Sequence, residues 1–477
     1  MCRFISNINL QRKRSHLLIS VIYLSAVILL GCQGKLYIFS TPPSELIHTA
    51  DEAFDSAAAI ILRGDTPEQI KNTDTKRQEL YNGAIALYTE TVVKDSNGIY
   101  AQRAHLEIAK IYMRRYQFNK AIEHYQAILK LANIGYYPSL AKDGIANIRK
   151  NREIVKDQLA KYHNVKTIYN KTPSDQTLNL AVESLYRLAQ TYEEMEDFPE
   201  AIRTYQRIVE EFPKHDKAPQ AQFQIGNIYF YGLYDYTIAG GWGAFVAVHK
   251  NYPNSKEAKE VFVLLKKAEK LLREIFDLQR KIQWYISEKS QNYNYSDRRG
   301  AGMSPLGLDE NRLIQYFQII AKNWVEMRNY PRAVQTYKTL VAEMFHKRNI
   351  SYKSSVVADA LYNIANLYQQ NKQFERAIHA YNNLFKKVPQ PSNWISKSIY
   401  QQAVCYHAIQ KYSDAYKGFK TYIQFAQNDN DTSYLQKAEQ IVHQFEQDQD
   451  KDGFYFYEEQ ENGTSDQDPN SQPRKGN

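Results

Sequence analysis

The sequence predicts an all-α fold in which short helices pair and stack along the chain as a helix-turn-helix solenoid. Apolar residues recur at three- and four-residue spacing over most of the chain, which is the period of one face of an α-helix. Glycine and proline are sparse, at 19 and 15 of 477 residues. The chain is too long for a single compact core, whereas a stack of helix pairs grows without one.

Residues 181–213 form the clearest unit and predict two helices. Their apolar faces hold Leu185, Leu188, Ala189 and Tyr192 in the first helix and Ala201, Tyr205, Ile208 and Val209 in the second. Pro199 fits the first turn of the second helix. Pro213 ends that helix because proline has no amide hydrogen to donate. The small Ala189 and Ala201 let the two helices approach closely.

This unit resembles a tetratricopeptide repeat, whose signature recurs at a period of about 34 residues. The matching residues are Leu188-Ala189, Tyr192, Ala201, Tyr205 and Pro213. Comparable steps begin at Ile108-Ala109, Ile225-Gly226, Ile320-Ala321 and Ile364-Ala365, and a looser copy begins at Ala403. The recurring prolines and aromatic residues argue against a coiled coil, which would show unbroken heptads.

Residues 1–31 predict an export signal with a basic start and an apolar run over residues 17–30. The run ends in Leu29-Leu30-Gly31-Cys32, which resembles the bacterial lipobox. That resemblance implies cleavage before Cys32 and attachment of acyl chains, such as palmitate, to its sulfur. An ordinary signal peptide or an uncleaved anchor is the alternative.

The residue after the cysteine and the overall charge bear on location and partners. Gln33 stands where enterobacterial lipoproteins kept in the inner membrane have aspartate. In a Gram-negative host the resemblance therefore implies the outer membrane, facing the periplasm; in a Gram-positive host it implies the outer face of the plasma membrane. The formal net charge is +9, but no long basic run is present, so nucleic acid is not expected as a partner.

The mature chain divides by composition into five segments. The expected order is a tether at 32–50, an N-terminal helical block at 51–287, a linker at 288–309, a C-terminal repeat block at 310–445 and an acidic tail at 446–477. Within the first block, Ala84 and Tyr88 indicate a degenerate first repeat, and 140–162 a charged helix. The glycine- and proline-containing linker is the clearest internal boundary. From Asn462 onwards the polar composition predicts disorder.

No catalytic constellation is present, so we do not expect an enzyme. The sequence lacks G-x-S-x-G, H-E-x-x-H and paired-cysteine motifs. Beyond Cys32 the mature chain has one cysteine, Cys405, which we expect to be a small core residue.

The resemblance implies a concave face lined by the first helix of each repeat. Its side chains would be Tyr186 with Gln190, Phe223 with Asn227, Tyr362 with Asn366, and Tyr400 with His407. Aromatic rings offer contact area at low entropic cost, and amides can hold an extended peptide. Packing of the aromatic residues between repeats is the alternative.

The tail contains the one metal-like motif. Asp448, Asp450, Asp452, Gly453 and Glu459 have the spacing of a calcium-binding EF-hand loop. Phe456 stands where a ninth-position polar ligand is usual, and no partner loop is evident. Apart from this calcium ion no cofactor is expected, and a solvated acidic tail is the alternative.

The lipobox and the repeats together resemble the BamD and YbgF types of outer-membrane tetratricopeptide-repeat lipoprotein. The resemblance implies a lipid-anchored, non-catalytic scaffold that binds envelope proteins or peptides during outer-membrane protein assembly or envelope maintenance. A different hypothesis makes the tail the working part, as a calcium-dependent binding module at the cell surface.

Overall fold

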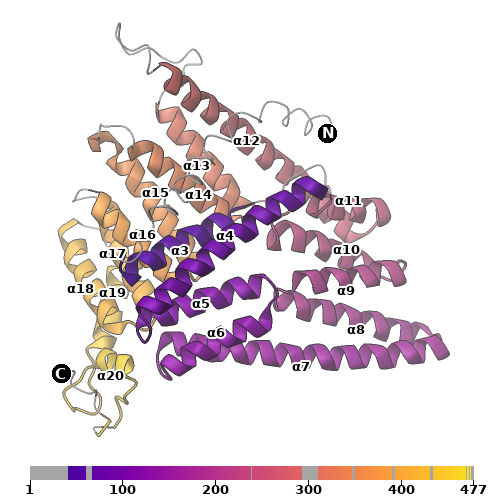
Figure 1. The fold of residues 1–477 in the computed structure, drawn as a ribbon, viewed down its shortest axis with the longest axis horizontal. Coiled ribbons are helices and arrows are strands. Elements are labelled where there is room, and N and C mark those ends of the chain that lie inside the picture. Colours follow the sequence, from indigo (N-terminus) through magenta and orange to yellow (C-terminus); the bar gives the residue numbers. More distant parts are fainter. Residues whose placement is uncertain are drawn as a thin grey trace. The chain divides into compact units, whose positions relative to one another are not determined.

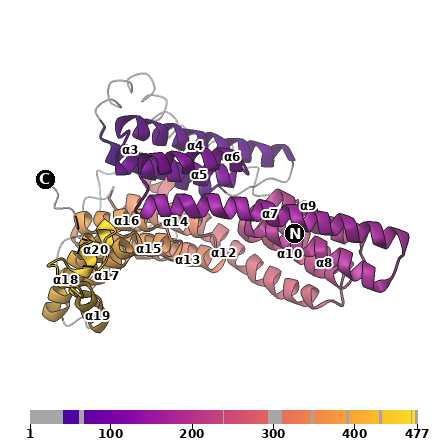
Figure 2. The ribbon, with the colours of Figure 1, turned by 90° about the horizontal axis from the view of Figure 1, so that it is seen from below.

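The computed structural model describes residues 41–60, 67–237, 239–292, 310–345, 350–388, 393–429, 433–468, 470, 471 and 473. Every regular element in these ranges is a helix, which confirms the predicted all-α class (Figures 1 and 2). Among the same residues, no helix is both long and apolar enough to cross a membrane. The predicted signal peptide and Cys32 lie outside the described residues.

The chain forms two compact units. The first comprises the described parts of Met1–Leu131 and Gly144–Ala244, and the second those of Ala132–Asp143 and Phe245–Asn477. The chain passes from the first unit to the second within α11. The helical elements up to that point are, in chain order, α3 (Pro43–Ala58), α4 (Pro67–Lys94), α5 (Ile99–Arg114), α6 (Phe118–Leu131), α7 (Tyr136–Lys171), α8 (Asp175–Glu194), α9 (Phe198–Glu211), α10 (Lys217–Asn227), the π-helical turn η1 (Ile228–Gly232) and α11 (Gly241–Asn251).

The second unit continues with long and short helices in succession. They are α12 (Lys256–Asn292), α13 (Glu310–Glu326), α14 (Tyr330–Phe345), α15 (Ile350–Gln370), α16 (Phe374–Lys387), α17 (Asn393–Ala408), α18 (Tyr412–Asp429), α19 (Leu435–Phe445) and α20 (Phe456–Asn462). From α12 to α19 each described helix contacts the next along the chain, as a stack of helix pairs requires.

Five helix pairs share a pair of alanines spaced twelve residues apart, one on each helix. All ten side chains are 0% exposed: Ala109 and Ala121, Ala189 and Ala201, Ala321 and Ala333, Ala365 and Ala377, and Ala403 and Ala415. A methyl group occupies little space, so the two backbones can approach closely at this point. Four residues after the second alanine lies a buried ring in each pair, namely Tyr125, Tyr205, Tyr337, Tyr381 or Phe419.

The turn between the paired helices also repeats. One residue in each of these five turns has a left-handed backbone, with φ between 56° and 60°: Tyr116, Glu196, Arg328, Lys372 and Gln410. The next residue donates its N–H to the carbonyl five residues back, as Asp197 does to Tyr192 at 2.8 Å and Gln373 to Tyr368 at 2.9 Å. This is the Schellman way of ending a helix, which usually employs glycine. None of the five turns has glycine at that position, so packing of the two helices must hold the strained residue in place.

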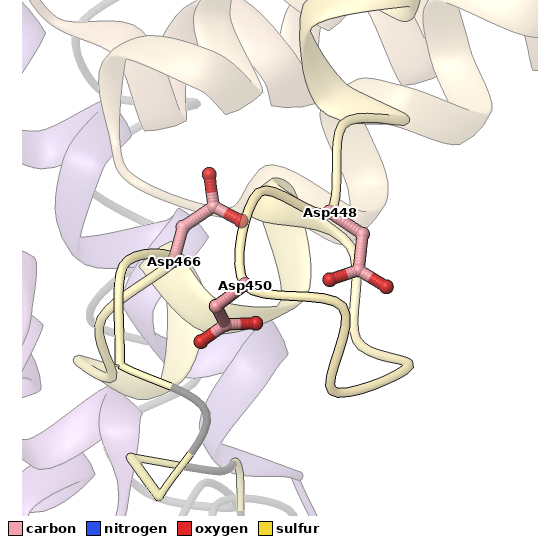
Figure 3. Close-up of side chains that lie close together, drawn as sticks. All are labelled: Asp448, Asp450 and Asp466. Atoms are coloured by element: carbon pink, nitrogen blue, oxygen red, sulfur yellow. The ribbon is translucent and has the colours of Figure 1, made fainter.

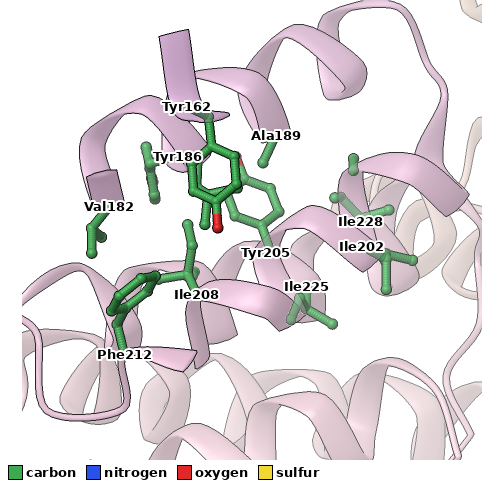
Figure 4. Packing of buried hydrophobic residues seen from close by; sticks show 13 residues of the cluster. Tyr162, Val182, Tyr186, Ala189, Ile202, Tyr205, Ile208, Phe212, Ile225 and Ile228 are labelled. Atoms are coloured by element: carbon green, nitrogen blue, oxygen red, sulfur yellow. The ribbon is translucent and has the colours of Figure 1, made fainter. Parts of the chain in front are cut away.

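The core of α8 and α9 shows how the pairs join their neighbours (Figure 4). Tyr205 and Ile208 of α9 are fully buried against Leu185 of α8, and Tyr162 of α7 is 1% exposed in the same cluster. The Arg207 guanidinium donates to the Tyr162 hydroxyl at 2.8 Å. The long charged helix predicted around 140–162 is therefore part of the stack.

The degenerate first repeat contains a buried ionic group. Asp51 of α3 is 6% exposed and accepts a hydrogen bond from the Tyr88 hydroxyl of α4 at 2.6 Å. Its other carboxylate oxygen accepts from the Arg103 guanidinium of α5. Removing either partner would leave a buried charge without full compensation, which is strongly unfavourable. This carboxylate thus ties three successive helices together.

Three boundaries differ from the sequence-based expectation. Residues 43–50 are not a tether but the start of α3, because Pro43 fits the first turn and Ile47 and Ala50 are fully buried. Helix α12 continues to Asn292, so the expected linker narrows, and residues 293–309 lie outside the described ranges. Finally, α12 belongs to the second unit and not to the N-terminal block.

Contacts between side chains explain this regrouping of α12. The Asn323 amide of α13 donates to the Glu274 carboxylate of α12 at 2.9 Å. Lys267 of α12 lies 2.8 Å from the Glu326 carboxylate of α13. These contacts join α12 to α13 across residues that lie far apart in the sequence.

The tail is folded through most of its length, in contrast to the expected disorder after Asn462. Helix α20 ends at Asn462 and is followed by Gly463, whose φ of +70° is the left-handed conformation that glycine favours. The Thr464 amide donates to the Glu459 carbonyl at 3.0 Å, and Asp466 is 6% exposed. The prediction of disorder from polar composition was wrong here because Asp466 is held by residues distant in sequence, such as Gln449.

The histidine pair between α5 and α6 makes stability depend on pH. The Nδ1 atoms of His105 and His124 lie 2.9 Å apart, so at most one of these two atoms can carry a proton. Burial, and secondarily His124, lowers the pKa of His105 from 6.5 to about 4, and burial lowers the pKa of His124. The unfolded chain therefore binds protons below pH 6.5 that the folded chain does not.

We predict that the melting temperature falls as the pH is lowered from 6.5 towards 4, and that His105→Gln makes this fall smaller. Thermal unfolding followed by circular dichroism at several pH values measures both. An identical pH dependence in the variant would contradict the assignment.

Candidate functional site

The predicted partner-binding residues of α8 separate into a buried aromatic ring and an exposed amide. Tyr186 is 7% exposed, and its ring meets the Tyr205 ring edge-on at 5.4 Å (Figure 4). The Lys217 ammonium lies 4.6 Å from the centre of the Tyr186 ring. Gln190, one turn further along α8, is exposed. Tyr186 is therefore a packing residue, and Gln190 is the member of this pair that is exposed to solvent.

On α15 the corresponding ring also packs against the second helix of its pair. The ring of Tyr362 lies 6.2 Å from that of Tyr381 and 5.0 Å from that of Trp394 on α17. Tyr362 is half-buried, and so is Asn366 one turn later. The α15 ring therefore keeps more exposed surface than its counterpart Tyr186.

The hydroxyl groups of the second-helix tyrosines form hydrogen bonds to the first helix of the same pair. Tyr205 donates to the Glu193 carboxylate at 3.1 Å, and Tyr381 donates to the Gln369 amide oxygen at 3.0 Å. In both cases the acceptor lies twelve residues before the tyrosine. Burial raises the pKa of Glu193, which lies in the first helix of its pair. The two repeats thus use one side-chain arrangement.

The other two predicted pairs are largely occupied by contacts within the protein. Tyr400 is 6% exposed and stacks on Tyr434 with ring centres 4.3 Å apart. The exposed His407 ring lies 5.6 Å from that of Phe445. Phe223 and Asn227 are half-buried, and the Asn227 amide donates to Gln224 at 2.9 Å.

For Tyr186 and Tyr400 the structure thus favours the alternative raised above, in which the ring packs between helices. The reason is geometric, because each ring meets a ring of the second helix in its pair, Tyr186 that of Tyr205 and Tyr400 that of Phe419. Gln190 and Asn366 remain as the polar members of the predicted face.

The acidic loop between α19 and α20 adopts the turn that its motif predicts. The Gly453 amide donates to Asp448 at 3.1 Å, the Asp452 amide to Asp450 at 3.2 Å and the Phe454 amide to Asp452 at 2.9 Å. Gly453 has φ of +93°, so the glycine serves the sharp turn for which this motif requires it. Each aspartate thus accepts a backbone hydrogen bond with one carboxylate oxygen, and its second oxygen has no hydrogen-bond partner.

A fifth carboxylate joins the four that the motif predicted. Oxygen atoms of Asp448, Asp450 and Asp466 lie within 4.8 Å of one another (Figure 3). Oxygen atoms of Asp450, Asp452 and Glu459 also lie within 4.8 Å of one another. Asp466 follows α20 and accepts a hydrogen bond from the Gln449 amide at 2.9 Å. The motif contains no signal for Asp466, because this residue lies beyond the twelve-residue loop.

The electrostatics of this cluster suit a divalent cation. Burial and the carboxylates of Asp450, Asp452 and Asp466 raise the pKa of Glu459 to about 7. Such a set, made of oxygen donors and negatively charged, can hold a hard cation of the calcium or magnesium kind.

The surroundings of Cys405 do not favour a reactive thiol. Cys405 is fully buried on α17, as expected. Burial, with a smaller contribution from Glu375, raises the pKa of its thiol to about 12. The thiolate, which is the reactive form, is therefore scarce at neutral pH.

Comparison with known proteins identifies the repeats. The family described as tetratricopeptide repeat matches residues 183–215 and 359–391. The first stretch contains the C-terminal part of α8 and all of α9, and the second contains the C-terminal part of α15 and all of α16. A comparison with curated proteins finds no match. These two stretches therefore match the tetratricopeptide repeat, a repeat type that serves in protein-interaction scaffolds.

Solved structures also show similarity, at low identity. The TPR2AB-domain:pHSP90 complex of yeast Sti1 is 15% identical, covers 72% of this chain and 98% of its own, and has a TM-score of 0.23. A tetratricopeptide repeat protein from Parabacteroides merdae ATCC 43184 is 12% identical, covers 83% of this chain and 99% of its own, and has a TM-score of 0.21. The TPR domain of P58(IPK) is 14% identical, covers 89% of this chain and 98% of its own, and has a TM-score of 0.20. These TM-scores support no inference from those proteins to this one.

The packing role of Tyr400 leads to a stability prediction. Tyr400→Ala should lower the free energy of unfolding by about 3 kcal/mol, because it leaves a cavity among Tyr434, Tyr422 and Phe419. Lys417→Ala, at an exposed position of α18, should change it by no more than about 0.5 kcal/mol. Denaturant unfolding monitored by circular dichroism measures both; equal effects would show that Tyr400 is not a core residue.

Proposed function

We propose that this protein is a non-catalytic scaffold, anchored by lipid at Cys32, that binds proteins or peptides of the cell envelope through its repeats. The observation that carries the proposal is the shared position of two amides. Gln190 and Asn366 each occupy the eighth position of a stretch that matches the tetratricopeptide repeat family. Each follows a tyrosine by one helical turn, on the first helix of its pair.

The chemistry of these amides suits recognition of a peptide. A carboxamide carries both a donor and an acceptor, so it can pair with the N–H and C=O groups of an extended backbone. The tyrosine beneath each amide is held against the second helix, so little side-chain entropy is lost there on binding. Stacked helix pairs of this type offer extended binding surfaces.

The anchor is supported by the sequence at the N-terminus. Gly31-Cys32 ends an apolar run of the length of a signal core, after a basic start. Several acyl chains on one cysteine would hold the protein firmly, since each buried methylene contributes about 0.8 kcal/mol. The resemblance to outer-membrane lipoproteins favours the periplasmic face of the outer membrane in a Gram-negative host, with a role in outer-membrane protein assembly or envelope maintenance.

Cys32→Ser should release the protein from the membrane. Fractionation of cells that produce each form compares the two, with the wild type expected in the membrane fraction and the variant in the soluble fraction. A variant that remains in the membrane fraction would refute lipid anchoring at this cysteine.

Replacing both amides should weaken capture of envelope partners. We expect Gln190→Ala/Asn366→Ala to retain several-fold less envelope protein than wild type in affinity purification from solubilised membranes. Lys386→Ala, at an exposed position on the second helix α16, is the matched control and should retain the wild-type amount. If the double variant and the control capture the same proteins in equal amounts, the amides are not the binding face.

A further inference from the structure

Six carboxylate oxygens in the tail are buried and have no hydrogen-bond partner. They are Asp448 Oδ1, Asp450 Oδ2, Asp452 Oδ2, Asp466 Oδ2 and both oxygens of Glu459. Glu459 is 0% exposed and Asp466 is 6% exposed. A buried charge is strongly unfavourable unless it is paired or coordinates a metal ion. This concentration of unsatisfied oxygens therefore points to a cation.

The spacing of the oxygens matches a calcium ion. Calcium takes six to eight oxygen ligands at about 2.3–2.6 Å, so two ligands on opposite sides of it lie roughly 5 Å apart. The two groups of three oxygens, which share Asp450, each fit within 4.8 Å. Magnesium prefers a smaller octahedron and usually keeps several waters, so a site with several carboxylates favours calcium.

We propose that calcium binds among Asp448, Asp450, Asp452, Glu459 and Asp466, and that it clamps the C-terminal segment onto the last repeat. Asp466 supplies the carboxylate that the loop itself lacks at its ninth position, where Phe456 stands. The ion would thus join three parts of the tail, namely the loop, α20 and the segment after α20.

One of the parts that the ion would join, α20, is already packed on α18. The Tyr457 ring of α20 stacks on Tyr416 with centres 4.5 Å apart and planes 12° apart. The Ser413 amide at the start of α18 donates to the Glu461 carboxylate at 3.0 Å. Terminal repeats of a stack need a cap with a polar outer face. Calcium would therefore stabilise the cap of the last helix pair, a role separate from partner binding at Gln190 and Asn366.

Calcium titration of the full-length chain in detergent tests the site directly. Isothermal titration calorimetry after chelator treatment should show one calcium ion bound to the wild type. Asp466→Asn and Glu459→Gln should each weaken binding by about tenfold or more, because each removes a charged ligand. Asp468→Asn is the control, since Asp468 is exposed and its side chain accepts from nearby Asn470; it should bind calcium as the wild type does.

Hydrogen exchange separates binding from clamping. In the wild type, calcium should slow amide exchange over residues 456–468, and Asp466→Asn should abolish this protection. A wild type that binds no calcium at millimolar concentration, or binds only magnesium, would overturn the proposal. Equal calcium affinity in Asp466→Asn would show that Asp466 is not a ligand. Unchanged amide exchange on calcium binding would show that the ion does not clamp the C-terminal segment.

Discussion

The close approach of two helices at a pair of buried alanines is the constraint on which the rest of the array depends. In five pairs these alanines stand twelve residues apart and are fully buried. That approach fixes the tight turn with its one left-handed residue, and it brings a buried ring of the second helix against the first. In two repeats a tyrosine hydroxyl then bonds back across the pair. A larger side chain at either alanine would disturb all of these contacts at once.

This constraint also decides which side chains remain for recognition. Aromatic rings that face the neighbouring helix, such as Tyr186 and Tyr400, are used to hold the stack together. Polar residues one turn away, such as Gln190, keep their surface. A scaffold built in this way would recognise partners with amides and charges supported by a rigid aromatic layer. The last pair differs, because α20 covers part of α18.

Helical period and the alanine-aromatic spacing were enough to predict the fold class, because both are local properties of the sequence. The start of α3 at Pro43 was missed because proline suits an extended tether as well as a first helical turn. The grouping of α12 depends on contacts such as Asn323 with Glu274, between residues far apart in sequence. For the same reason the motif predicted Asp448, Asp450, Asp452 and Glu459 but not Asp466, which the fold returns to the loop after α20.

Site-specific photo-crosslinking in intact cells tests the central claim, that the first helices of the repeats carry the partner-binding face. A photo-reactive amino acid would replace Gln190, Asn366 or, as an outer-helix reference, Lys386, one position at a time. The account predicts crosslinked envelope proteins from Gln190 and Asn366 and none from Lys386. Adducts from Lys386 alone would place the partner on the second helices and contradict the account.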